Sequence, residues 1–170
     1  HTHTQRKMAA SPENARISVV VQGCYRGVGA SSVVRRLVYD TFSTEHEATM
    51  GIRHSTLDLD PDDANVSLTF LVSDCDGDPS HSESSAGTID RAHVIILVVS
   101  CIRADGGNAG DVIDETKRKN PHTPILLVAT HTDILPTGTD ILGEIMRYNG
   151  LNKKHLECIV GELPISVSLN

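Results

Sequence analysis

The stretch that decides the fold runs from Ala15 to Ser32 and reads ARISVVVQGCYRGVGASS. Ile17 to Val21 is a short β-branched apolar run, which predicts a buried strand. Glycines follow at positions 23, 27 and 29, and the next segment, VVRRLVYD (33–40), has apolar residues at helical spacing. The order strand, glycine-rich turn, helix indicates a loop whose backbone N–H groups meet a helix N-terminus and favour an anion, typically phosphate.

The glycine-rich turn resembles the phosphate-binding pattern G-x-x-x-x-G-K-[ST]. Gly29 and Ser31 fit this pattern, but Ala30 stands where the pattern has its lysine. Cys24 occupies the position of the first glycine, because Gly23 is one residue too far from Gly29. The sequence therefore predicts a phosphate cradle that has lost its cation.

Length and composition favour a single ordinary domain. The chain has 170 residues, 39% of them hydrophobic, and a formal net charge of −7. This length allows a normal core, and the negative charge argues against nucleic acid or an anionic membrane surface as the main partner. No apolar run is long enough to span a membrane, and no secretory signal is recognisable.

The cysteines and the N-terminus bear on the cellular setting. Cysteines at positions 24, 75, 101 and 158 form neither a C-x-x-C pair nor a zinc-site spacing. We therefore expect a reduced intracellular protein, cytoplasmic or held at a membrane or organelle by partners. The opening HTHTQRK resembles an expression-tag remnant, so we expect residues 1–14 to be tag and flexible N-terminus, and 15–170 to be the domain.

The rest of the chain alternates between predicted strands and helices. Strands are predicted at 53–59, 66–72, 94–99, 125–128 and 163–167, and helices at 106–121 and 140–148. The first two of these strands flank the turn PDDAN and predict a β-hairpin, whereas VIILVV at 94–99 predicts a central parallel strand. The polar segment 75–92 predicts a mobile loop with at most one weak helix. The order predicts a three-layer α/β domain with a mainly parallel sheet and one antiparallel hairpin at its edge.

Two further motifs follow predicted strands. DCDG at 74–77 matches D-x-x-G, in which the carboxylate can hold Mg²⁺ and the glycine lets the backbone approach a terminal phosphate. THTD at 130–133 is close to T-K-x-D, whose carboxylate accepts both N–H groups on the Watson–Crick edge of guanine. Each motif alone could be an ordinary turn, so the prediction depends on their combination with the glycine loop.

In order and spacing, these motifs resemble those of the Ras superfamily of small GTPases over nearly all of residues 15–168. TMG at 49–51 falls where that family has the Thr-x-Gly of its first switch. The stretch 120–135 is most similar to the Rho branch and the stretch 47–58 to the Rab branch, so no branch is assigned. The resemblance implies a P-loop GTPase-like domain, with GTP or GDP and Mg²⁺ as cofactors if nucleotide binding survives.

The resemblance also implies a role for each matching residue. Gly27, Val28 and Gly29 would wrap the phosphates, and Gly77 would contact the γ-phosphate. The predicted nucleotide-binding loop also includes Arg26, Ala30, Ser31 and Ser32. Around Mg²⁺ the resemblance places Ser31, Thr49 and Asp74. Around the guanine base it places Thr130, His131, Asp133 and Ser166.

Several departures from the family pattern bear on activity. Arg26 could supply the charge that Ala30 lacks, or it could fill the pocket, and we favour obstruction. Asp78 stands where the family keeps the glutamine that orients the attacking water, and a carboxylate there would repel the γ-phosphate or act as a base. No catalytic residue is therefore assigned. His131 replaces a lysine that lies along the base and covers less of it. Because the chain stops at Asn170, the C-terminal helix of the family is expected to be missing.

Two main hypotheses follow. The first is a pseudoGTPase, a small-GTPase fold used as a regulatory or protein-interaction module with weak or no nucleotide binding. The second is a divergent GTP/GDP switch with slow or partner-assisted hydrolysis. An unrelated α/β domain with chance motifs is the remote alternative. In either leading case protein partners are expected at the switch-like loops 43–55 and 76–92.

Overall fold

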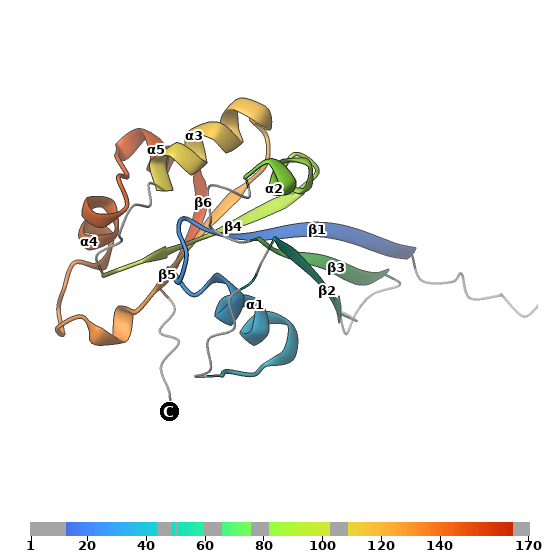
Figure 1. Cartoon of the computed structure of the whole chain (residues 1–170), viewed down its shortest axis with the longest axis horizontal. Coiled ribbons are helices and arrows are strands. Elements are labelled where there is room, and N and C mark those ends of the chain that lie inside the picture. The colour runs from blue at the N-terminus through green and yellow to red at the C-terminus, as the bar shows by residue number, and fades with distance from the viewer. Residues whose placement is uncertain are drawn as a thin grey trace, which may run out of the picture.

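A six-stranded sheet with helices on both sides forms the domain (Figure 1). The computed structural model describes residues 13–43, 49, 51–59, 66–75, 82–102 and 109–164. The strands are β1 (Glu13–Gly23), β2 (Ile52–Leu59), β3 (Val66–Cys75), β4 (Val94–Ser100), β5 (Ile125–Thr130) and β6 (Ile159–Pro164). The helices are α1 (Ala30–Tyr39), α2 (Ser82–Ile89), α3 (Ala109–Lys119), α4 (Ile141–Tyr148), α5 (Lys153–Glu157) and the 3-10 turn η2 (Thr132–Ile134).

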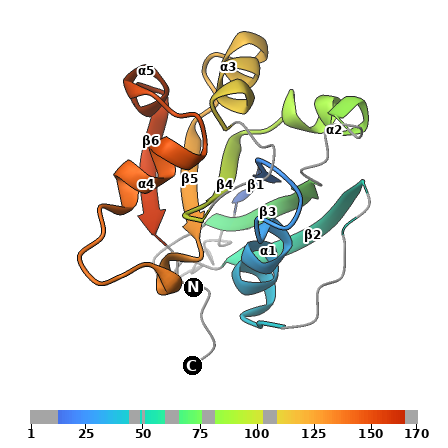
Figure 2. The same cartoon turned by 60° about the vertical axis from the view of Figure 1, so that its left-hand side comes forward.

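The strand order confirms the predicted fold class. The order across the sheet is β2-β3-β1-β4-β5-β6 (Figure 2), and β2 is antiparallel to β3. The pairs β1–β3, β1–β4, β4–β5 and β5–β6 are parallel. The sheet is thus mainly parallel, and the predicted hairpin forms its antiparallel edge.

Three layers surround a core dominated by β-branched side chains. Helix α1 lies on one side of the sheet, and α2 and α3 lie on the other (Figure 1). Both faces of β4 are therefore covered, which explains why its sequence VIILVVS is apolar without alternation. Leu97, Val98 and Val99 are at most 1% exposed, and β4 is the central parallel strand that the sequence predicts.

The parallel strands bring the three motifs to one edge of the sheet. Gln22 of β1 is level with Cys75 of β3, and Ser100 of β4 is level with Thr130 of β5. The segments that follow β1, β3 and β5 therefore leave from the same carboxyl edge, which is where ligands of open α/β sheets bind.

The C-terminal part differs from the prediction. The last strand, β6, begins at Ile159, four residues before the predicted strand 163–167, whose residues 165–167 lie outside the described part. The reason is the short helix α5, which Asn152 and His155 start with reciprocal side-chain-to-backbone hydrogen bonds of 3.1 and 3.2 Å. Helix α5 ends at Glu157, so the chain reaches the level of Ile125 already at Ile159.

Candidate functional site

The loop between β1 and α1 requires glycine at two positions for its backbone conformation. Gly27 and Gly29 have φ angles of 78° and 94°, in the left-handed region that favours glycine. A third glycine, Gly23, is needed for space, because a Cβ there would lie 2.6 Å from Val28 Cγ1. The first N–H groups of α1 follow this loop directly, which is the arrangement that favours an anion.

Thr130, the last residue of β5, holds the loop from behind. Its Oγ1 lies 2.7 Å from the carbonyl oxygen of Val28 and 3.1 Å from that of Val99. The Val28 side chain is only 1% exposed. Thr130 therefore holds the loop through the backbone of Val28, and the hydrophobic core holds it through the Val28 side chain.

We expect Gly29→Ala to destabilise the domain by about 1–2 kcal/mol, because alanine rarely adopts the left-handed conformation. Chemical denaturation measures this loss. The matched control is Gly87→Ala in α2, where φ is not positive and a Cβ meets nothing within 4 Å; this change is expected to be neutral or slightly stabilising. Equal effects at the two positions would contradict the assignment.

The structure brings together the three residues predicted to hold Mg²⁺. Ser31 Oγ lies 2.7 Å from Thr49 Oγ1, and the Thr49 hydroxyl donates to Asp74 Oδ2 at 3.2 Å. They come from α1, from a position ahead of β2, and from the carboxyl end of β3. We call these three residues the metal-side cluster.

The metal-side cluster has the chemistry that Mg²⁺ prefers. The groups that would coordinate the metal are two hydroxyls and a carboxylate, all hard oxygen ligands. Asp74 is 2% exposed, and its Oδ1 is buried without a hydrogen-bond partner among the described residues. A buried carboxylate oxygen without a partner is costly, so a cation or its bound water would satisfy it. The residues present therefore fit the metal.

The electrostatic setting of Asp74 also favours a bound cation. Burial raises the pKa of its carboxyl, and hydrogen bonds from Ser31 and Thr49 and the charges of Arg53 and Arg35 oppose this shift. A raised pKa means that this group's contribution to stability is fully present below its ordinary pKa and is lost as pH rises through the raised pKa. At neutral pH the buried charge therefore opposes folding until a cation compensates it.

We expect Asp74→Asn to be more stable than the wild type at neutral pH without Mg²⁺, and to lose stabilisation by Mg²⁺. At Mg²⁺ ten times above its dissociation constant, the wild type is expected to gain about 1.4 kcal/mol. Thermal unfolding with and without MgCl₂ measures both effects. The control Asp58→Asn removes an exposed carboxylate that accepts from Thr69 and is expected to keep the Mg²⁺ response. An Asp74→Asn protein that responds to Mg²⁺ like the wild type would refute the assignment.

The glycine loop and the end of β5 line a cavity of about 200 Å³, which we call the base-side cavity. Gly29, Ser32, Phe42, Thr130, His131 and Asp133 line it. Three segments distant in sequence thus converge there, and they include the predicted base-reading carboxylate. Phe42 was not predicted to belong to the site, because it begins the polar stretch FSTEHEA (42–48), which contains no binding motif.

His131 is held in a defined position at this cavity. Its backbone has φ 59°, which is unusual for a residue other than glycine. Its Nδ1 lies 3.0 Å from Ser100 Oγ and 3.1 Å from Thr130 Oγ1. The ring is therefore tied to the ends of β4 and β5, whereas Asp133 on η2 is exposed.

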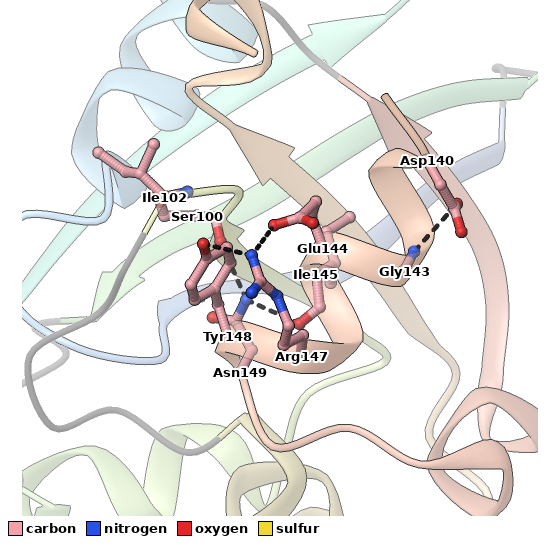
Figure 3. A network of polar contacts seen from close by, with 9 residues as sticks. All are labelled: Ser100, Ile102, Asp140, Gly143, Glu144, Ile145, Arg147, Tyr148 and Asn149. Carbon is pink, nitrogen blue, oxygen red and sulfur yellow. Dashed lines mark hydrogen bonds and ion pairs between the residues drawn. The ribbon is translucent and has the colours of Figure 1, made fainter. Parts of the chain in front are cut away.

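A fully buried asparagine, Asn149, connects the end of β4 to α4 (Figure 3). The Asn149 amide donates to the carbonyl oxygen of Ser100 at 2.9 Å and to that of Ile145 at 3.0 Å. Its Oδ1 lies 3.6 Å from the thiol of Cys24, and its own carbonyl accepts from Ala109 N–H at 3.0 Å. Asn149 thus joins the glycine loop, β4, α3 and α4. Burial raises the pKa of Cys24 to about 12, so this thiol stays protonated as a donor.

The structure says less about the other predicted site residues. The Arg26 side chain is exposed and does not line the base-side cavity. Ala30, at the start of α1, is 9% exposed. Gly77, Asp78 and Ser166 lie outside the described residues, so their roles stay predictions. The structure describes the two switch-like loops in part, over 43, 49, 51–55 and 82–92.

The comparison with known families agrees with this geometry. A family model described as "Ras of Complex, Roc, domain of DAPkinase" matches residues 19–133, which is more than half of the chain. A search of curated proteins found no match at the accepted threshold. The matched residues include the glycine loop, the metal-side cluster and the base-side THTD segment. The chain belongs to the Roc family, the Ras-of-complex GTPase domains of the Ras superfamily.

Proposed function

We propose that this Roc domain is a pseudoGTPase, a regulatory or protein-interaction module that binds guanine nucleotide weakly or not at all and hydrolyses it little. The observation that carries the proposal is Ala30. It occupies the first position of α1, directly after Gly29, where the phosphate-loop pattern has lysine. A methyl group there supplies no charge to a polyphosphate.

The expected cost of this replacement is large. A preorganised positive charge opposite a phosphate contributes several kcal/mol, and every 1.4 kcal/mol changes affinity tenfold. A loss of about 3 kcal/mol therefore lowers affinity by roughly two decades. Asp78 at the position of the water-orienting glutamine further supports slow hydrolysis, because a carboxylate repels the γ-phosphate.

The remaining parts of the site support residual recognition of a nucleotide. Ser31, Thr49 and Asp74 would hold Mg²⁺, whose charge would partly neutralise the phosphates. Asp133 would accept from guanine, and His131 and Ser32 would lie beside the base. These residues would bind and orient the nucleotide, whereas no described residue is assigned a chemical step.

The proposal favours proteins over nucleic acid as partners. The net charge of −7 disfavours nucleic acid. In the part of the chain that the structure describes, no helix is long and apolar enough to cross a membrane. We propose that partners bind at the switch-like loops 43–55 and 76–92, whose described parts include the first half of β2 and all of α2.

A divergent GTP/GDP switch is the second candidate. The buried Asp74 Oδ1, which has no hydrogen-bond partner among the described residues, favours it, because a bound cation would satisfy this oxygen. The base-side cavity is also lined by the predicted base-binding residues rather than filled by Arg26.

Titration calorimetry with GDP and GTP in Mg²⁺, with ADP as a control for base choice, distinguishes the two candidates. The pseudoGTPase proposal predicts a Kd for GDP weaker than about 1 μM, corresponding to less than roughly 8 kcal/mol of binding free energy, or no binding. A nanomolar Kd would overturn it in favour of the switch.

A further inference from the structure

A second cavity of about 200 Å³ lies beside the metal-side cluster. It shares Ser31 and Asp74 with that cluster, and Arg35 and Arg53 also line it. Val34 and the hydroxyl residues Tyr39, Thr41 and Ser55 complete the lining, and the hydroxyl oxygens of Tyr39 and Ser55 lie 3.1 Å apart. We call this space the arginine cavity. Two guanidinium groups and several hydroxyls make it rich in hydrogen-bond donors.

The fold places both arginines on the side where Ser31 and Asp74 lie. Arg35 follows Ser31 by four residues on α1, so the two side chains share one face of the helix. Arg53 of β2 is directly opposite Asp74 of β3 in the antiparallel pair, so these side chains point to the same face of the sheet. Both arginines act electrostatically on the Asp74 carboxyl.

The carboxylate of Asp74 has room for a further ligand beside the two arginines. The charges of Arg53 and Arg35 act on this carboxyl, yet among the described residues no group donates a hydrogen bond to its buried Oδ1. The arrangement of an unsatisfied carboxylate oxygen next to two guanidinium groups suits a cation and an anion together, such as a metal-bound phosphate.

We propose that Arg35 and Arg53 form a displaced phosphate-binding pair, which supplies from α1 and β2 the positive charge that Ala30 does not supply from the glycine loop. The ligand is a phosphate group of a polyphosphate bound with Mg²⁺ at Ser31, Thr49 and Asp74. Guanidinium groups suit this role because their fork of N–H donors matches phosphate oxygens. The inference rests on the proposed function in its weak-binding form and explains what affinity remains.

No motif in the sequence marks Arg35 or Arg53 as a phosphate ligand. Arg26, inside the glycine loop, was the candidate for the missing charge that lies nearest to Ala30 in sequence. Arg35 is six residues after Gly29, and Arg53 is 24 residues after it. Only the pairing of β2 with β3 brings Arg53 to the site. Arg26 lines neither of the two cavities beside the loop.

The test is titration of the wild type and of the double variant Arg35→Gln/Arg53→Gln with Mg·GTP, Mg·GDP and Mg·pyrophosphate. The double variant is expected to bind Mg·GTP at least tenfold more weakly than the wild type. The matched control is Arg36→Gln, an exposed arginine on the same helix that pairs with Asp40 at 3.3 Å. This control is expected to bind like the wild type.

Two further variants protect the test against misfolding. Arg35→Lys/Arg53→Lys keeps both charges, and Ala30→Lys added to the glutamine double variant restores a charge in the loop. Both proteins are expected to recover at least part of the binding, and thermal unfolding checks that each variant is folded.

The outcomes separate this inference from the proposed function. Equal affinity of the wild type and a folded glutamine double variant would overturn the arginine pair and leave weak nucleotide binding intact. A wild type that binds none of the three ligands would also overturn the pair, while the interaction module would stand. Binding of Mg·pyrophosphate that depends on both arginines, without binding of GTP, would support the pair and assign it to free polyphosphate instead of a nucleotide.

Discussion

Ala30→Lys is expected to raise the affinity for Mg·GDP and Mg·GTP about 100-fold, which corresponds to roughly 2.8 kcal/mol. Position 30 is the first residue of α1 and follows the left-handed Gly29. A lysine there would add a charge next to N–H groups that already favour an anion. Its flexible stem can lie along apolar surface while the ammonium group reaches the phosphates. Titration calorimetry of the two proteins measures the gain.

The control for this gain is Ala30→Gln, which adds a chain of similar reach without a charge. The glutamine variant is expected to bind no more tightly than the wild type. If the lysine variant gains nothing, or if glutamine gains as much, the missing cation is not what weakens the site.

Asn149→Ala is expected to destabilise the domain by about 3 kcal/mol. Asn149 is fully buried, and its amide donates to the carbonyl oxygens of Ser100 and Ile145. Alanine would leave the Ser100 carbonyl without this donor and would leave a void, and each effect costs more than 1 kcal/mol. Urea denaturation measures the loss in the free energy of unfolding.

Asn152→Ala is the matched control for Asn149→Ala. Asn152 caps α5 through a hydrogen bond of 3.1 Å from His155 N–H, and losing such a cap costs about 1 kcal/mol. A loss at position 149 no larger than the loss at 152 would show that Asn149 does not join the elements around the glycine loop.

Much of the fold could be predicted because the decisive signals are local. The run ISVVV before the glycines predicts β1, and VIILVV predicts β4 because a strand covered on both faces needs no polar alternation. The hairpin β2–β3 was predicted from two alternating segments around a turn, and the order of elements led to the parallel sheet. The Ras-superfamily resemblance followed from three short motifs, and the Roc family match confirms it.

Other features depend on contacts between distant parts of the chain. The start of β6 is set by α5, whose capping pair Asn152 and His155 departs from the usual pattern with Glu or Gln. Phe42 lines the base-side cavity together with Thr130, His131 and Asp133, which are far from it in sequence. Arg53 faces Asp74 only through the register of β2 with β3. Spacing along the sequence carries no record of these juxtapositions.

The most direct test of the central claim is the nucleotide content of freshly purified protein, released by denaturation and resolved by chromatography. A domain whose phosphate site lacks its lysine is predicted to retain far less than one guanine nucleotide per chain, because a weakly held nucleotide dissociates during purification. Near-stoichiometric GDP or GTP in the purified protein would contradict the pseudoGTPase account.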